Sequence, residues 1–165
     1  MTRTLILTRH AKSSWDDPWL ADHERPLNKR GRKAAGRIGR WLTERGYIPD
    51  QVVSSDAMRT RETLARMDLP TISTKFTRNL YHAGPLAMLD TLSKADGETV
   101  LLLGHNPGIA DFATRLVTRA PAHSRFLDYP TCATTIIRFD VKGWAGLNWN
   151  SGDVLEFVIP RELTA

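Results

Sequence analysis

Two histidines stand directly after apolar runs that are typical of buried strands. His10 follows the run 4–8 and has Arg9 beside it, and His105 follows the run 99–103 after a single glycine. The carboxyl ends of parallel strands meet at one edge of an open α/β sheet, so this placement predicts that both imidazoles reach the same crevice. A lone histidine is more often a surface or structural residue, but two at equivalent strand ends indicate nucleophilic or acid–base chemistry.

A third predicted strand end carries an arginine. Arg59 falls in the first turn of the helix expected after the strand 51–54, and its guanidinium offers a permanent charge and a fork of donors that matches phosphate oxygens. The segment 104–108, G-H-N-P-G, adds a helix start that favours an anion. Taken singly, each feature has an ordinary explanation, as a surface arginine or a helix cap. Together with the histidines they predict a site for a phosphoryl group.

Three motifs and their order resemble the signature of the histidine phosphatase superfamily. They are T-R-H-A at residues 8–11, S-S-x-x-x-R-x-x-x-T at 54–63, and G-H at 104–105. Within that superfamily, R-H-A-K-S-S-W at 9–15 followed by R-P-L-N-K-R-G at 25–31 resembles the SixA-type phosphohistidine phosphatase branch. Each motif is weak alone, but the combination is specific, and the likeness extends over essentially the whole chain.

The resemblance implies a phosphatase that uses a covalent phosphohistidine intermediate. It makes His10 the nucleophile, places Arg9, Arg59 and His105 around the phosphoryl group, and gives Arg25 a further phosphate contact. A neutral imidazole is a competent nucleophile near neutral pH, and cationic side chains stabilise the phosphoryl oxygens during in-line transfer. That set of cations makes a metal unnecessary, so no metal and no other cofactor is expected.

One departure from the superfamily bears on the substrate. Many members carry an acidic proton donor in the loop after the third strand, whereas here no carboxylate occurs between Asp68 and Asp90, and His82 is the candidate for that position. The imidazole of a phosphohistidine leaves more readily than an alkoxide, so a missing acid favours a phosphoramidate substrate. Lys12 and Ser13 are expected to line the pocket. Phosphatase action on small-molecule phosphate esters remains the alternative.

The rest of the chain alternates helix and strand signals, which predicts a three-layer α/β/α fold with a central, mostly parallel mixed sheet. The resemblance implies the same architecture, the phosphoglycerate mutase-like fold of histidine phosphatases, in a single domain over 1–165. Helices are expected at 28–45, with Asn28 as N-cap, at 56–67, with Asp56 as cap, at 85–94 and at 106–119. Further strands are expected at 71–76, 134–140 and 153–159, the last two as antiparallel neighbours. Three glycines inside 28–45, at 31, 36 and 39, weaken that helix.

The composition is that of an ordinary globular protein, and the charge distribution suits either an anionic partner or a well-solvated basic surface. The 165 residues are 41% hydrophobic and 25% charged, and a net charge of +5 is concentrated in residues 1–66. The expected partner is a phosphorylated protein or a small phosphorylated molecule. The basic segment 29–45 also suggests a nucleic-acid-binding module, which is disfavoured because stacking aromatics are not regularly interleaved. A phosphate-binding pseudoenzyme is disfavoured because all four catalytic candidates are present.

The remaining features concern location and the rim of the pocket. The unpaired Cys132, the short apolar run at the N-terminus and the lack of a long apolar stretch predict a cytoplasmic protein without a membrane contact. Asp16 and Asp17 with His23 could in principle hold a metal, but adjacent carboxylates in such a loop are more often solvated. Trp15 and Trp19 are candidates for the rim of an open, shallow pocket or for core caps. The sequence does not indicate the oligomeric state.

Overall fold

The computed structural model describes residues 1–70 and 73–163. Its central element is a six-stranded sheet with the spatial order β3-β2-β4-β1-β5-β6. The strands are β1 (Arg3–Arg9), β2 (Gln51–Ser55), β3 (Thr74–Thr77), β4 (Thr99–Gly104), β5 (Thr134–Phe139) and β6 (Asp153–Val158). The α-helices are α1 (Lys29–Glu44), α2 (Met58–Met67), α3 (Pro85–Ser93) and α4 (Gly108–Leu116).

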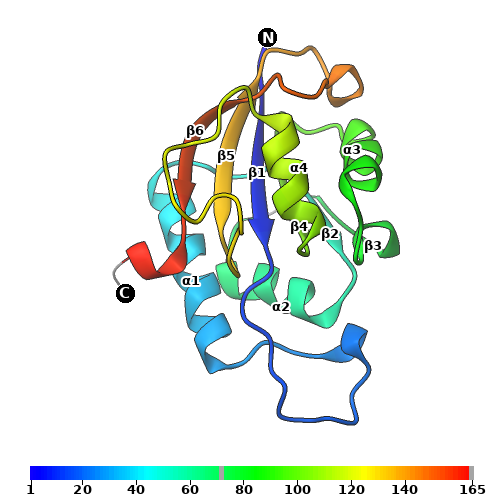
Figure 1. Cartoon of the computed structure of the whole chain (residues 1–165), viewed down its shortest axis with the longest axis vertical. Helices are drawn as coiled ribbons and strands as arrows, with labels where there is room; N and C mark the ends of the chain where they lie inside the picture. The colour runs from blue at the N-terminus through cyan, green and yellow to red at the C-terminus, as the bar shows by residue number, and fades with distance from the viewer. Residues whose placement is uncertain (71–72, 164–165) are drawn as a thin grey trace.

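Pairing within the sheet confirms the expected mixed topology. The strands β3, β2, β4 and β1 run parallel, whereas β5 is antiparallel to both β1 and β6. The connections from β1 to β2, from β2 to β3 and from β3 to β4 each contain an α-helix, and residues 140–152 join β5 to β6 (Figure 1). The predicted antiparallel pair at the C-terminal side of the chain is therefore confirmed.

Helices cover both faces of the sheet, which gives the three layers. Along β1 the side chains alternate: Leu5 and Leu7 pack into one core with α3 and α4, and Ile6 packs into the other with α1 and α2. This alternation follows from the two-residue period of a strand buried on both sides. Figure 1 shows α3 and α4 on one side of the strands and α1 and α2 on the other. The three-layer α/β/α architecture is therefore confirmed.

The register of β1 and β4 brings the two catalytic candidates together. Arg9, the last residue of β1, is level with Gly104, the last residue of β4. The next residues, His10 and His105, therefore leave neighbouring strand ends side by side, and the His10 amide also bonds to the Gly104 carbonyl at 3.1 Å. The expectation that both imidazoles reach one crevice is borne out by this register.

The glycines of α1 permit close contact with other backbone segments. A Cβ on Gly31 would collide with the Lys12 carbonyl oxygen, and one on Gly39 would collide with the Met67 carbonyl of α2. Helix propensity alone suggests that glycine weakens the helix, but at these two positions only glycine allows the observed packing. Asn28 caps the helix as expected, accepting a hydrogen bond from the Gly31 amide at 2.8 Å.

Three sequence-based boundaries need correction. Asp56 does not cap α2, because Ala57 occupies the N-cap position and the Asp56 carboxylate bonds to His23 at 2.7 Å and to Arg78 at 3.2 Å. The helix expected at 106–119 spans Gly108–Leu116, since residue 117 leaves it to bridge with the segment before β6. The strand expected at 71–76 is observed at Thr74–Thr77, and residues 71–72 lie outside the described residues.

No helix in residues 1–70 or 73–163 combines the length and the apolar character needed to cross a membrane.

Candidate active site

The hydrogen bonds of His10 determine which ring nitrogen is reactive. Its Nδ1 lies 2.7 Å from the carbonyl oxygen of Ala11. Because a carbonyl can only accept, Nδ1 carries the proton and the lone pair remains on Nε2. The Ala11 amide in turn donates to Thr63 Oγ1 at 2.9 Å, so the threonine of the second motif holds the backbone beside the histidine. The local structure thus presents Nε2 as a nucleophile in a fixed orientation.

His10 is uncharged in this environment. The residue is 7% exposed. Burial is the main cause that lowers the pKa of His10 to about 3; the bond to the Ala11 carbonyl opposes this shift and the positive charges of nearby arginines, Arg9 foremost, add to it. A pKa this low leaves the imidazole unprotonated, and thus nucleophilic, at neutral pH.

His105 packs against His10 and is also neutral. The two ring centroids are 5.2 Å apart, and His105 Nε2 is 2.8 Å from Ser55 Oγ, at the end of β2. Burial is the main cause that lowers the pKa of His105 to about 2, and the positive charge of Arg59 adds to it. Three parallel strand ends, those of β1, β4 and β2, therefore supply His10, His105 and the residue that orients His105.

Three arginines concentrate positive charge around the histidines. Arg59 is 3% exposed and Arg25 is 7% exposed, which is unusual for charged residues unless they serve a binding or structural purpose. The pKa of Arg9 is lowered, first by burial and then by the positive charge of Arg59. Positive charges clustered in a partly buried cavity favour the binding of an anion. Guanidinium groups match the geometry of phosphate oxygens in particular.

The segment 10–28 folds back so that Arg25 reaches the site. A bridge between Ser13 and Leu27 closes the base of this loop. Arg25 Nη1 then donates to Ser13 Oγ at 2.8 Å and to the Ser14 carbonyl at 3.0 Å, and the guanidinium lies 3.5 Å from the centroid of the Trp15 ring. Trp15 therefore forms part of the rim, one of the two roles considered for it, and stacks on a phosphate-binding candidate.

Sequence reasoning missed one acidic residue of the site. The Asp22 carboxylate receives hydrogen bonds from Tyr81, from His82 at 3.1 Å and from Arg59 at 3.0 Å. Its other oxygen pairs with Arg25 at 3.2 Å. In the sequence, its only signal is its position three residues before Arg25. In the structure, it begins the short 3₁₀ turn Asp22–Glu24. A single acidic residue in a loop carries no periodicity that could have identified it.

Asp22 is held in its ionised form. Burial alone would raise the pKa of this carboxyl, but the hydrogen bonds from Tyr81, His82 and Arg59 outweigh burial and hold the pKa well below its ordinary value. The carboxylate therefore orients the surrounding donors and does not carry a proton near neutral pH. His82, the expected stand-in for a proton donor, bonds to this carboxylate and packs 5.3 Å from the His105 ring.

All eight sequence-predicted site residues line one open cavity of about 280 Å³. They are Arg9, His10, Lys12, Ser13, Arg25, Arg59, His82 and His105. Trp15, Asp22, Asn106 and Thr131 complete the lining. The structure therefore brings together every residue that the sequence analysis selected, and Asp22 is the only carboxylate among the lining residues.

The alternative metal site is not assembled. His23 bonds to Asp56 and lies 3.6 Å from Glu24, instead of joining Asp16 and Asp17. Among residues 1–70 and 73–163, no group of three or more histidine, cysteine or acidic side chains is placed to hold a metal ion.

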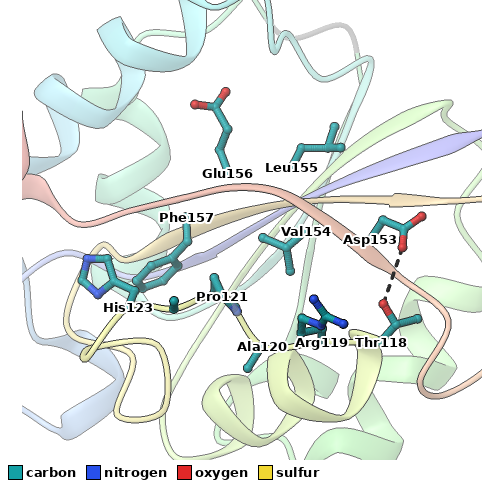
Figure 2. Close-up of a pocket in the computed structure, with 11 residues that line it drawn as sticks. Thr118, Arg119, Ala120, Pro121, His123, Asp153, Val154, Leu155, Glu156 and Phe157 are labelled. Atoms are coloured by element: carbon teal, nitrogen blue, oxygen red, sulfur yellow. Dashed lines mark hydrogen bonds between the residues drawn. The ribbon is translucent and has the colours of Figure 1, made fainter.

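A larger hollow of about 760 Å³ lies along the outer side of β6 (Figure 2). Its histidine, His123, packs on Phe157 and bonds to Glu162 at 2.9 Å, and Thr118 bonds to Asp153 at 3.5 Å. The residues that line it do not combine a nucleophile with converging cations. The chemistry therefore points to the smaller cavity at the strand ends.

Known proteins share both the sequence and the fold. Residues 5–77 match the family model described as the histidine phosphatase superfamily (branch 1). A structure of a candidate phosphohistidine phosphatase SixA from Nakamurella multipartitia is 30% identical, with a TM-score of 0.83 over 97% of each chain. The SixA protein histidine phosphatase crystallised with tungstate, 20% identical, has the same fold, with a TM-score of 0.75 over 96% of this chain and 98% of that one.

Curated relatives extend the match in other organisms. An uncharacterized protein of Mycobacterium tuberculosis is 33% identical over 163 residues, which cover 93% of this chain and 99% of that protein. An uncharacterized chloroplastic protein of Arabidopsis thaliana is 35% identical over 130 residues, which are 70% of this chain but 60% of the plant protein. From the motifs, the fold and these matches, the chain belongs to the SixA-type branch of the histidine phosphatase superfamily.

Proposed function

We propose that this protein is a phosphatase that hydrolyses phosphohistidine through a covalent intermediate on His10. One observation carries the proposal: the bond from His10 Nδ1 to the Ala11 carbonyl leaves the Nε2 lone pair free inside a cavity lined by three arginines. A neutral imidazole in a fixed orientation is suited to attack phosphorus. The surrounding guanidinium groups are suited to the charge that spreads over the phosphoryl oxygens.

The reaction then has two transfers. In the first, His10 Nε2 attacks the phosphorus, the phosphorus–nitrogen bond to the substrate imidazole breaks, and that imidazole leaves with its electron pair and a proton. In the second, water attacks the phosphorus of phosphorylated His10, the new phosphorus–nitrogen bond breaks, and inorganic phosphate and neutral His10 are released. The guanidinium groups of Arg9, Arg25 and Arg59 hold the phosphoryl oxygens in both transfers, and their charge makes a metal ion unnecessary.

The acid–base character of the cavity supports a phosphoramidate over a phosphate ester. An ester leaving group needs a proton donor, whereas the only carboxylate lining the cavity, Asp22, is held ionised by its hydrogen bonds. A phosphohistidine can be protonated on its own ring, so its imidazole leaves without a strong acid from the protein. The open form of the cavity also suits a phosphorylated side chain on a protein surface.

The test is a quenched reaction with phosphoramidate and with a phosphohistidine peptide, comparing wild type, His10→Ala and His123→Ala. His123 lies outside the cavity, so its variant controls for the loss of any histidine. We expect acid-labile, alkali-stable phosphate on wild type and on His123→Ala, and neither label nor turnover with His10→Ala. Turnover without label in quenches made within the first turnover, or label that persists in His10→Ala, would refute the assignment of His10.

A parallel assay with O-phosphoserine, a small ester with an alkoxide leaving group, separates the two substrate classes. We expect a kcat/KM at least about 10-fold higher on the phosphohistidine peptide, because the alkoxide of O-phosphoserine leaves poorly without a proton donor. A preference for the ester would favour the small-molecule alternative instead.

A further inference from the structure

A second, basic groove adjoins the catalytic cavity. It has a volume of about 490 Å³ and shares Lys12 and Thr131 with that cavity. Six cationic side chains line it, and none of its lining residues is acidic. The six are Lys12, Arg30, Lys33, Arg37, Arg125 and Arg161. Such a concentration of one sign of charge in a concave surface attracts anionic ligands.

Most of these cations form no ion pair within residues 1–70 and 73–163. Arg125 pairs with Asp128 at 3.0 Å. For the other five, no carboxylate lies within ion-pair distance in the part of the chain that the structure describes. Some cations outside the groove are paired: Arg45, Arg66 and Arg78 each face a carboxylate. Mutual repulsion in the groove is therefore left to be relieved by solvent ions or by a bound partner.

The cations are arranged along a line, not around a point. Arg30, Lys33 and Arg37 follow one another at intervals of three and four residues, so they form one row on α1 that extends for about 10 Å. The facing wall comes from two other segments, which contribute Arg125 and Arg161. A single phosphate would need donors that converge, whereas this row matches carboxylates spaced along an extended acidic surface.

The other exposed feature near the cavity favours a protein as the ligand. Trp15, which lines the catalytic cavity, is 75% exposed, and Trp19 in the same loop is 93% exposed. Exposed tryptophans beside a binding site are typical anchors for protein partners. The lining of the basic groove itself holds no aromatic side chain on which nucleic-acid bases could stack.

From these observations we infer that the basic groove docks an acidic face of the phosphohistidine protein on which the enzyme acts. The inference rests on the proposed function and goes further, because it names the feature of the substrate that lies outside the phosphoryl group. Lys12, at the boundary of both cavities, joins the docking row to the catalytic site. The enzyme then selects its substrate by the charge around the phosphohistidine as well as by the phosphoryl group itself.

Two synthetic helical peptides test the inference. Each carries one phosphohistidine; one has glutamates in a row spaced by three and four residues, and the other has glutamines at the same positions. For wild type we expect a kcat/KM about 10-fold higher on the glutamate peptide, the size expected for three partly exposed ion pairs, and a smaller difference at high salt. The effect should appear mainly in KM.

The variants separate docking from chemistry. Replacing Arg30, Lys33 and Arg37 by glutamine should remove the preference while turnover of phosphoramidate stays unchanged, because these residues lie outside the catalytic cavity. The matched control replaces Arg40, Lys75 and Lys142, which are exposed cations outside the groove. The control removes the same net charge and should keep the preference. Thermal melting checks that both triple variants are folded.

Several outcomes would overturn the inference. A preference that survives in the groove variant, or that is lost equally in the control, would show that the groove does not recognise acidic residues. Binding of a single-stranded oligonucleotide that disappears in the groove variant, without a glutamate preference, would identify nucleic acid as the ligand. If wild type turns over neither peptide nor phosphoramidate, the proposed function fails, and anisotropy with the unphosphorylated peptides still decides whether the groove docks the acidic one.

Discussion

Acidification should destabilise this protein through its two neutral histidines. Burial lowers the pKa of His10 to about 3 and that of His105 to about 2, far below the value of an unfolded histidine. Between these folded and unfolded values the unfolded chain binds protons that the folded chain does not. The contribution of each histidine is therefore fully present above about pH 7 and decreases as the pH falls below the unfolded pKa of about 6.5.

The size of the effect follows from the same two pKa values. At about pH 5 an unfolded histidine is almost fully protonated while His10 in the folded protein remains neutral. This difference lowers the free energy of unfolding by about 2 kcal/mol. His105 adds a similar amount, so the free energy of unfolding should fall by about 4 kcal/mol between about pH 8 and pH 5. Carboxyl groups contribute little in this range, because an unfolded aspartate has a pKa of only about 3.9.

Urea unfolding across this pH range measures the effect, and NMR of isotope-labelled histidine side chains reports the two pKa values directly. Signals assigned through His10→Gln and His105→Gln should show no inflection between about pH 8 and 5, and His10→Gln should lose about half of the pH dependence of stability. Inflections near pH 6.5 from both residues, or a stability that stays flat on acidification, would refute the neutral, desolvated site.

Four substitutions test other parts of the structure. Gly39→Ala should lower the free energy of unfolding by about 1–3 kcal/mol, because the added methyl group meets the Met67 carbonyl of the facing helix. Gly36→Ala, where the nearest atom to the added methyl group is 3.6 Å away, should raise the free energy of unfolding by up to about 1 kcal/mol. Urea titration of both variants compares the two effects. Asp22→Asn should lower the free energy of unfolding by about 1–2 kcal/mol at neutral pH, because solvent screens this partly exposed ion-pair cluster. Below about pH 4 its stability should decline less steeply than that of wild type, because the variant lacks the carboxyl whose lowered pKa stabilises the fold. A decline as steep as in wild type would contradict this. Ser55→Ala removes the 2.8 Å partner of His105 and should lower kcat on phosphoramidate about 10-fold, with KM little changed, in steady-state assays.

The candidate catalytic residues could be predicted from sequence because they follow strands. A parallel strand delivers the residue after its last pair to the same edge as its neighbour, so His10 and His105 meet although they are far apart in the chain. The second motif has an equally local explanation. Arg59 and Thr63 lie one helical turn apart, and Thr63 holds the backbone next to His10. The positions of these residues relative to strand ends and helix turns can therefore be predicted from the expected secondary structure.

Features that depend on contacts between distant loops were not predictable. Asp22 acquires its role only when the loop 10–28 folds over the site and meets Tyr81 and His82. Gly39 appeared to weaken its helix because propensity describes an isolated helix, whereas its packing against Met67 is tertiary. Likewise, the basic residues of α1 resemble a solvated face until Arg161 is brought opposite them.

Under the proposed mechanism, the charges of the site explain why one arrangement suits both transfers. The same burial and cations that receive a phosphoryl group also keep His10 neutral before the substrate enters. A histidine of low pKa is a weaker base, which makes it a better leaving group when water attacks the phosphorylated form. Its weaker nucleophilicity in the first transfer is offset because Nε2 is already oriented by the bond to the Ala11 carbonyl. The site therefore favours turnover of the intermediate over its accumulation, and a short quench time is needed to trap phosphorylated His10.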